Sequence, residues 1–270
     1  MQASVWIIAA AASLMAAPVP ASATADTLDE AAYNQALRRL HLDLTRDELI
    51  ALAEREYDRI ERAMRALAHQ VDASTTWQQI VDDLERRHRP ASLAEVIPAY
   101  RKETERARAF VVAKDLVTLP DAAPLAIEPT PPELLETFPY VIYQWRDALL
   151  VTLAFRDDAA GVEEALRTHN NGLIAVAAVH EVYPGHRVQN LTRPGMQIAE
   201  AFTEGWGLYV EELMFRLGYY DDRPPAIKLF ALRMLLHRAA RALLDPKIHR
   251  GDLSPEAAIR FLVERVGISR

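Results

Sequence analysis

The chain has 270 residues, of which 50% are hydrophobic and 26% are charged, and its formal net charge is −7. This is ordinary globular composition and indicates one domain. The acidic balance argues against nucleic-acid binding, which usually needs a basic surface, and the absence of cysteine excludes disulfides, a lipid-carrying cysteine and thiolate metal ligands.

Residues 1–25 have the pattern of a secretory signal peptide. They contain no charged side chain, and the apolar run in "ASVWIIAAAASLMAAPVPASATA" leads into A-x-A-like cleavage sites at 21–23 and 23–25. The alternative is an uncleaved anchor, but the run is shorter than the ~20 apolar residues of a spanning helix. We therefore expect an exported protein, periplasmic or secreted, without stable membrane association after cleavage.

The chain that follows is predicted to be mainly helical. Sequences typical of capping boxes precede apolar-periodic runs at 27–30, 45–48 and 92–95. The second opens the clearest helix, whose apolar stripe consists of Leu49, Leu52, Ala53, Ile60, Met64 and Leu67. Further helices are predicted over 77–87 and over 93–114, the latter with a kink at Pro98.

The middle of the chain changes character. Residues 116–139 contain six prolines and are predicted to be extended. "YVIYQW" and "LLVTLAF" then indicate two strands over 140–155, joined by a turn at Arg146 and Asp147.

Helices are expected again from Gly172. They are predicted over 199–217, over 225–244 and in a last short helix with Ser254 as cap and Pro255 at its first position. The fold class is therefore mainly α (α+β), a single helical domain over 26–270 with a small sheet or hairpin.

The segment "AVAAVHEVYPGHRVQ" is close to the zinc-protease signature H-E-x-x-H. However, four residues separate Glu181 from the next histidine, His186. A helix turns ~100° per residue, so His180 and His186 would diverge by ~120° on a regular helix. Pro184 and Gly185 lie between them and disfavour a regular helix. We predict a local break or bulge that returns His186 to the side of His180.

A third ligand is available in "AEAFTEGWGLYVEEL", where Glu204 lies in apolar surroundings. Two histidines and one glutamate form the catalytic zinc site of many hydrolases. Glu181 would then act as general base toward a water acidified by the metal. Glu211 is seven positions after Glu204, on the same face, and is the best candidate to orient a ligand. The alternative is that these histidines are structural.

The motifs "HEVYPGHRVQ" and "EGWGLYVEEL" resemble H-E-x-Y-P-G-H-H-x-Q and E-G-W-x-L-Y-x-E-E-L of the bacterial family called domain of unknown function 885. That family is grouped with zinc metallopeptidases of the gluzincin type. The resemblance runs from about Leu44 to the C terminus. It implies a zincin-like helical domain with Zn²⁺ as cofactor. The site residues that it implies are His180, His186 and Glu204 as ligands and Glu181 as catalytic base.

The late segment "RAARALLDPKIHRGDLSPEAA" is similar to the family's R-x-x-x-D-x-x-x-H pattern. It draws attention to Arg241, Asp245 and His249, which would share one helix face. The resemblance implies that Arg241 or His249 stabilises an oxyanion, with Asp245 as a supporting group. The alternative is an exposed row of salt bridges, which contributes little energy. Tyr209 is a further candidate donor to the oxyanion, although a tyrosine on such a helix more often packs.

Two departures from the family pattern affect the expected function. Arg187 stands where the family has the second histidine of its H-H pair, and the chain resembles only the C-terminal half of the family's usual length. We expect an exported zinc-dependent hydrolase that cleaves short peptides, aligned by backbone pairing with the strands over 140–155. A non-catalytic relative that binds a peptide or partner protein is the alternative, and hydrolysis of a small non-peptide amide or ester uses the same groups.

Overall fold

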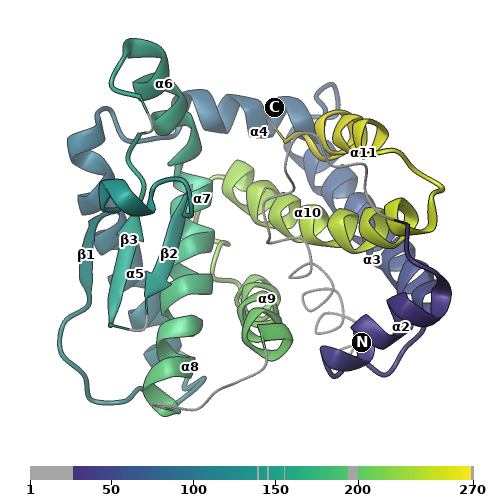
Figure 1. Ribbon diagram of the computed structural model, residues 1–270. Helices are drawn as coiled ribbons and strands as arrows, with labels where there is room; N and C mark the ends of the chain where they lie inside the picture. The colour runs from purple at the N-terminus through teal and green to yellow at the C-terminus, as the bar shows by residue number, and fades with distance from the viewer. Residues whose placement is uncertain (1–26, 139, 145, 155, 194–199, 269–270) are drawn as a thin grey trace. The chain divides into compact units, whose positions relative to one another are not determined.

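The structure is a computed structural model that describes residues 27–138, 140–144, 146–154, 156–193 and 200–268 (Figure 1). The predicted signal peptide lies outside these residues. The α-helices are α2 (Glu30–Arg39), α3 (Arg46–Val71), α4 (Trp77–Arg87), α5 (Leu93–Ala113), α6 (Ala159–Thr168), α7 (Asn171–Ala177), α8 (His186–Thr192), α9 (Glu200–Arg216), α10 (Pro225–Arg250) and α11 (Pro255–Phe261). The described chain is therefore mainly helical, as the sequence predicts.

Shorter elements complete the fold. The strands are β1 (Ala126–Pro129), β2 (Val141–Gln144) and β3 (Ala148–Val151), and a 3-10 turn, η1, covers Pro132–Leu134. The described residues also include the π-helical turns η2 (Ala178–Val182) and η3 (Leu262–Val266). Across the described ranges, no helix is long and apolar enough to cross a membrane.

The chain forms two compact units. The first contains the described residues through Gln70, α9 through Tyr209, and the chain from Leu232. The second contains the residues from Val71 up to α9, the rest of α9 from Val210, and the chain through Ala231. The single helix α9 thus contributes residues to both.

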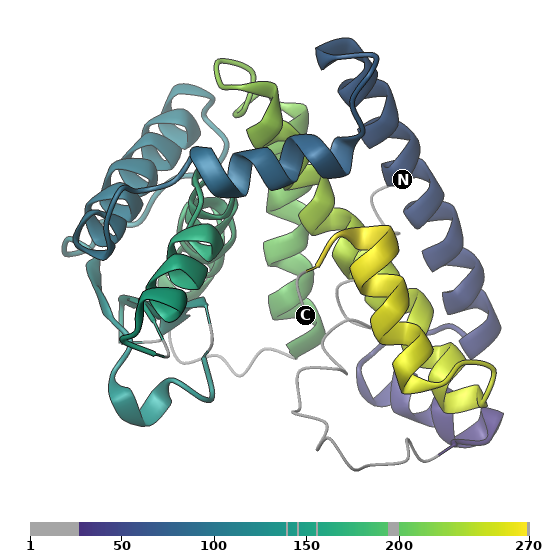
Figure 2. The same ribbon diagram turned by 90° about the horizontal axis from the view of Figure 1, so that it is seen from above.

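The first unit is helical. The predicted stripe of α3 is largely buried, with Leu49 and Met64 fully inside. In Figure 2, α3 lies alongside the C-terminal helices. Lys247 of α10 donates to the carboxylate of Glu54 on α3 at 2.8 Å. The predicted cap at 45–48 is confirmed, because Glu48 Oε2 accepts from the Thr45 N–H at 2.7 Å. The cap at 27–30 is wrong, since the N-cap of α2 is Asp29, whose side chain accepts from Ala32 N–H.

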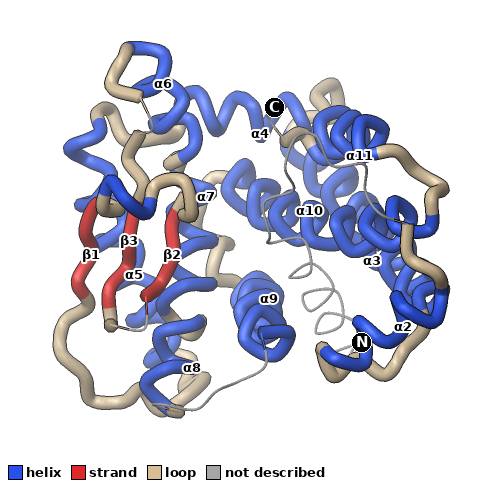
Figure 3. Tube along the Cα trace, in the orientation of Figure 1, coloured by secondary structure: helices blue, strands red, loops and turns tan. Residues whose placement is uncertain are grey.

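The second unit contains a three-stranded sheet in the order β1-β3-β2 (Figure 3). β2 and β3 form the predicted antiparallel pair, with Tyr143 opposite Leu149. The proline-rich segment also supplies β1, which pairs in parallel with β3 and was predicted only as extended chain. Helix α6 was not predicted.

Side chains cap the N-termini of α4, α6 and α7 in the second unit, but not those of α5 and α8. Thr76 and Gln79 form a capping box at α4, whose bounds agree with the prediction. The expected box at Ser92 is wrong, because the Ser92 side chain makes no cap bond and Glu95 accepts instead from the Ala91 N–H at 3.1 Å.

Candidate metal centre

The histidine segment is broken in the way that its sequence predicts. Helix α7 gives way to the π-turn η2, which carries His180 and Glu181. Tyr183 is extended, Gly185 is the N-cap of the next helix, and α8 begins at His186. A regular helix therefore does not connect the two histidines.

Gly185 allows the chain to fold back on itself. A Cβ at this position would lie 1.7 Å from the His180 carbonyl oxygen and 2.4 Å from that of Val179. No other residue fits this approach without moving backbone. As a result, the rings of His180 and His186 have centroids 4.7 Å apart and planes inclined at 85°.

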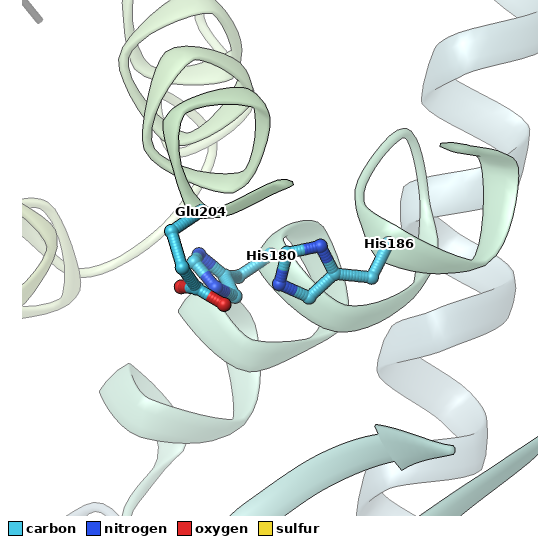
Figure 4. Close-up of side chains that lie close together, drawn as sticks. All are labelled: His180, His186 and Glu204. Carbon is cyan, nitrogen blue, oxygen red and sulfur yellow. The ribbon is translucent and has the colours of Figure 1, made fainter. Parts of the chain in front are cut away.

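His180, His186 and Glu204 come together at one point (Figure 4). Their donor atoms all lie within 4.8 Å of one another, with His180 buried and the other two half-buried. Tetrahedral zinc with bonds of about 2.0–2.2 Å holds its ligand atoms about 3.5 Å apart. The three atoms therefore lie at most about 1.3 Å farther apart than the ligands of a formed zinc site. The donor set and its spacing fit zinc.

Nδ1 of each imidazole lies against a side-chain oxygen. His180 Nδ1 lies 2.7 Å from Glu211 Oε1 in a buried contact, and His186 Nδ1 lies 3.4 Å from Gln189 Oε1. A carboxylate or amide oxygen that accepts from Nδ1–H fixes the tautomer in which Nε2 is the ligand atom. Glu211 thus occupies the place expected of it from the sequence.

Glu181 lies beside this cluster and is held by the sheet. Its Oε2 accepts the backbone N–H of Tyr143 at 2.9 Å, and its Oε1 lies 4.0 Å from His180 Nε2. Sequence reasoning did not find the role of Tyr143, since nothing local to β2 indicates which strand residue meets Glu181. The carboxylate is oriented by main chain rather than by a side chain.

Arg241, Asp245 and His249 lie on successive turns of α10, which continues through Pro246. Asp245 is buried, accepts from the Tyr33 hydroxyl at 2.6 Å and lies 3.6 Å from His249 Nε2. Burial raises the pKa of the Asp245 carboxyl, while the Tyr33 hydrogen bond and the charges of His249 and Arg241 oppose this rise. A buried carboxylate at the centre means that the row is not an exposed salt-bridge ladder.

Arg241 shares its surroundings with one of the expected metal ligands. Burial and the neighbouring charge of Arg238 lower the pKa of Arg241, whereas the carboxylates of Glu204 and Asp245 raise it. The oxyanion roles of Arg241 and His249 stay predictions. So does that of Tyr209, whose ring packs 5.9 Å from the ring of Trp206.

The chain is similar to one family and to two solved structures. It matches the family model described as bacterial protein of unknown function (DUF885) over residues 7–270. The structure of a putative lipoprotein of unknown function from Shewanella oneidensis superposes with a TM-score of 0.74 at 21% identity, covering 90% of this chain and 48% of that one. The crystal structure of a protein described as a putative lipoprotein, from Colwellia psychrerythraea, gives a TM-score of 0.70 at 20% identity over 88% of this chain and 42% of that one.

These likenesses show the fold, and the chain spans about half the length of the structures that it matches. No curated protein sequence matches it. Because the family model covers nearly the whole sequence, the chain belongs to the DUF885 family.

Proposed function

We propose that this protein is an exported zinc-dependent hydrolase that cleaves short peptides, with Glu181 as general base. The observation that carries the proposal is the convergence of His180, His186 and Glu204 within 4.8 Å. The two histidines can lie side by side because the helix breaks between them, at Gly185. A structural role for the histidines would not need a second carboxylate, Glu181, held beside them.

His180, His186 and Glu204 would hold the ion. Zinc, when bound, lowers the pKa of a water to about 7 and polarises a carbonyl oxygen. Glu181 accepts the proton of the attacking water and returns it to the leaving amine. The Tyr143 N–H keeps this carboxylate in place through both transfers. Arg241 or His249 would stabilise the oxyanion, and residues 1–25 would direct export.

The edge of the sheet supports a peptide as substrate. Thr152 N–H donates to the Tyr140 carbonyl. The backbone N–H and C=O groups of Tyr140, and of every second residue after it, therefore face β3. Val141 and Tyr143 therefore direct their backbone groups away from β3, along the outer side of the described sheet. An extended peptide can pair with Val141 there. The Tyr143 N–H already binds Glu181, which would place the reacting part of the peptide next to the base.

The decisive experiment measures metal content and cleavage together. The wild-type protein should hold one zinc per chain and cleave a mixed-peptide library, and a chelator should abolish cleavage until zinc is restored. Glu181→Gln should keep the zinc and lose about 10²–10⁴-fold in turnover, the range of general-base catalysis. Glu164→Gln, on the surface of α6, is the matched control and should behave as wild type.

Each departure from this result has a distinct meaning. Undiminished cleavage by Glu181→Gln would reject the base. Zinc without any cleavage by the wild type would favour the non-catalytic binding protein. Cleavage of esters or small amides but not of peptides would replace the substrate class.

A further inference from the structure

Arg187 is the residue at which the chain departs from the H-H pair of its family, and its side chain is only 3% exposed. Its guanidinium contacts both carboxylate oxygens of Asp147, with Nε at 2.8 Å and Nη2 at 2.9 Å. Nη2 also donates to the Ala123 carbonyl at 2.7 Å, and Nη1 donates to the Tyr183 hydroxyl. A bidentate pair fixes orientation as well as distance, which a single imidazole cannot do.

Asp147 belongs to the turn between β2 and β3. Its backbone has a left-handed φ of 62°, and its N–H donates to the Gln144 carbonyl at 2.9 Å. Its Oδ1 also accepts from the Tyr143 hydroxyl at 3.2 Å, and that hydroxyl accepts from Asn190 Nδ2 at 3.1 Å. Helix α8 is thus joined to the β2–β3 hairpin twice, through Arg187 and through Asn190.

His186 needs such a support because of the break that precedes it. Helix α8 has seven residues, and a helix this short is marginal without tertiary contacts. The segment from Tyr183 to Gly185 is not helical, so helical hydrogen bonds do not transmit the orientation of η2 to His186. The direction of the His186 imidazole must come from what holds α8.

The same hairpin also holds Glu181, through the Tyr143 N–H. We infer that Arg187 is a positioning residue: by clamping Asp147 it fixes α8, and with it His186, against the hairpin that orients Glu181. Its charge is balanced by Asp147, so it adds no net charge beside the two histidines. The consequence for metal binding rests on the proposed function, whereas the ordering of α8 does not.

The test compares Arg187→Met with Arg223→Met. Arg223 also has a largely buried guanidinium, paired with the buried Glu103, and so controls for the general cost of deleting such a group. The first measurement is amide hydrogen exchange in the metal-free protein. The amides of α8 should exchange at least about tenfold faster in Arg187→Met than in Arg223→Met. The two variants are compared at temperatures equally far below their own thermal unfolding midpoints.

The second measurement is zinc affinity by competition with a chelator. The zinc affinity of Arg187→Met should be about 10–100-fold lower than that of the wild type, the usual effect of removing a group that orients a ligand. The zinc affinity of Arg223→Met should stay near that of the wild type. Arg187→Lys should fall between, because an ammonium cannot form the two parallel bonds. If Arg187→Met does not fold, Asp147→Asn replaces it, because this change weakens the same ion pair at Asp147. Its α8 amide exchange and zinc affinity are then compared with those of Arg223→Met.

The outcomes separate the two proposals. Equal α8 exchange in the two Met variants would overturn the inference. Faster α8 exchange with wild-type zinc affinity would also overturn it, because the clamp would then not position His186. Faster exchange in a protein that binds no zinc even as wild type would support the ordering of α8 and reject the proposed function.

Discussion

Nδ1 of His180 and Oε1 of Glu211 lie 2.7 Å apart in a buried contact that joins the π-turn to helix α9. The carboxylate fixes the tautomer and direction of the imidazole, so its loss should weaken metal binding. Glu211→Gln should lower zinc affinity about tenfold and Glu211→Ala about 100-fold. Chelator competition measures both. The neighbouring Glu212→Gln is the control, and an equal loss in that variant would contradict the specific role of Glu211.

Gly185→Ala should be among the most damaging single-methyl changes in the chain. The added Cβ would meet the His180 carbonyl oxygen at 1.7 Å, so the backbone between the histidines must move. We expect a loss of more than about 4 kcal/mol in the free energy of unfolding, measured by urea titration. Gly251→Ala is the control, because it has a positive φ of 83° but no contact closer than 3.5 Å, and should cost about 1–2 kcal/mol.

Tyr33→Phe should destabilise the first unit by about 1–3 kcal/mol, the cost of leaving a buried acceptor unsatisfied. The hydroxyl that is removed donates to the buried Asp245 at 2.6 Å. Tyr57→Phe removes a hydroxyl whose contact with the Arg265 carbonyl is 3.4 Å long, and should change the free energy of unfolding by less than about 0.5 kcal/mol. Chemical denaturation measures both variants. Equal losses of unfolding free energy in Tyr33→Phe and Tyr57→Phe would show that the buried Asp245 carboxylate does not depend on the Tyr33 hydroxyl.

Stability should fall as the pH is lowered below about 6.5. Burial, and then the charges of Arg238, Arg241 and Arg233, lower the pKa of His237 to about 3. The unfolded chain binds a proton near pH 6.5 that the folded chain binds only near pH 3, so folding weakens by about 1.4 kcal/mol per pH unit between these values.

His237→Gln should reduce this slope, as measured by urea unfolding from pH 7 to pH 4.5. Part of the slope will remain, because burial also lowers the pKa of His169. An unchanged slope in the variant would mean that His237 is protonated in the folded protein.

Local patterns predicted much of this fold. The bounds of α4, the β2–β3 hairpin and the break between His180 and His186 follow from apolar spacing, turn residues and the Pro184–Gly185 pair. These signals lie within a few residues of the structure they specify. The choice of Asp29 over Thr27 as N-cap shows their limit, because two suitable side chains compete within three positions.

What the sequence could not predict depends on distant pairing. Strand β1 forms because residues such as Ile127 pair with β3, where Leu149 is its partner. The proline-rich segment alone indicates only extended chain. The role of Arg187 depends on its pairing with Asp147, which lies forty positions earlier in the chain. The convergence of Glu204 with two histidines was expected from the family motifs, and its chemistry stays a prediction.

Helix α9 carries both Glu204 and Glu211, and this imposes a constraint on how the gene can vary. Seven residues of helix amount to about 700°, so the two carboxylates project on nearly the same azimuth about 10.5 Å apart along the axis. A single-codon insertion or deletion between them would swing Glu204 by ~100° while Glu211 kept its histidine. Functional homologues should therefore tolerate substitutions in this stretch but no change in its length.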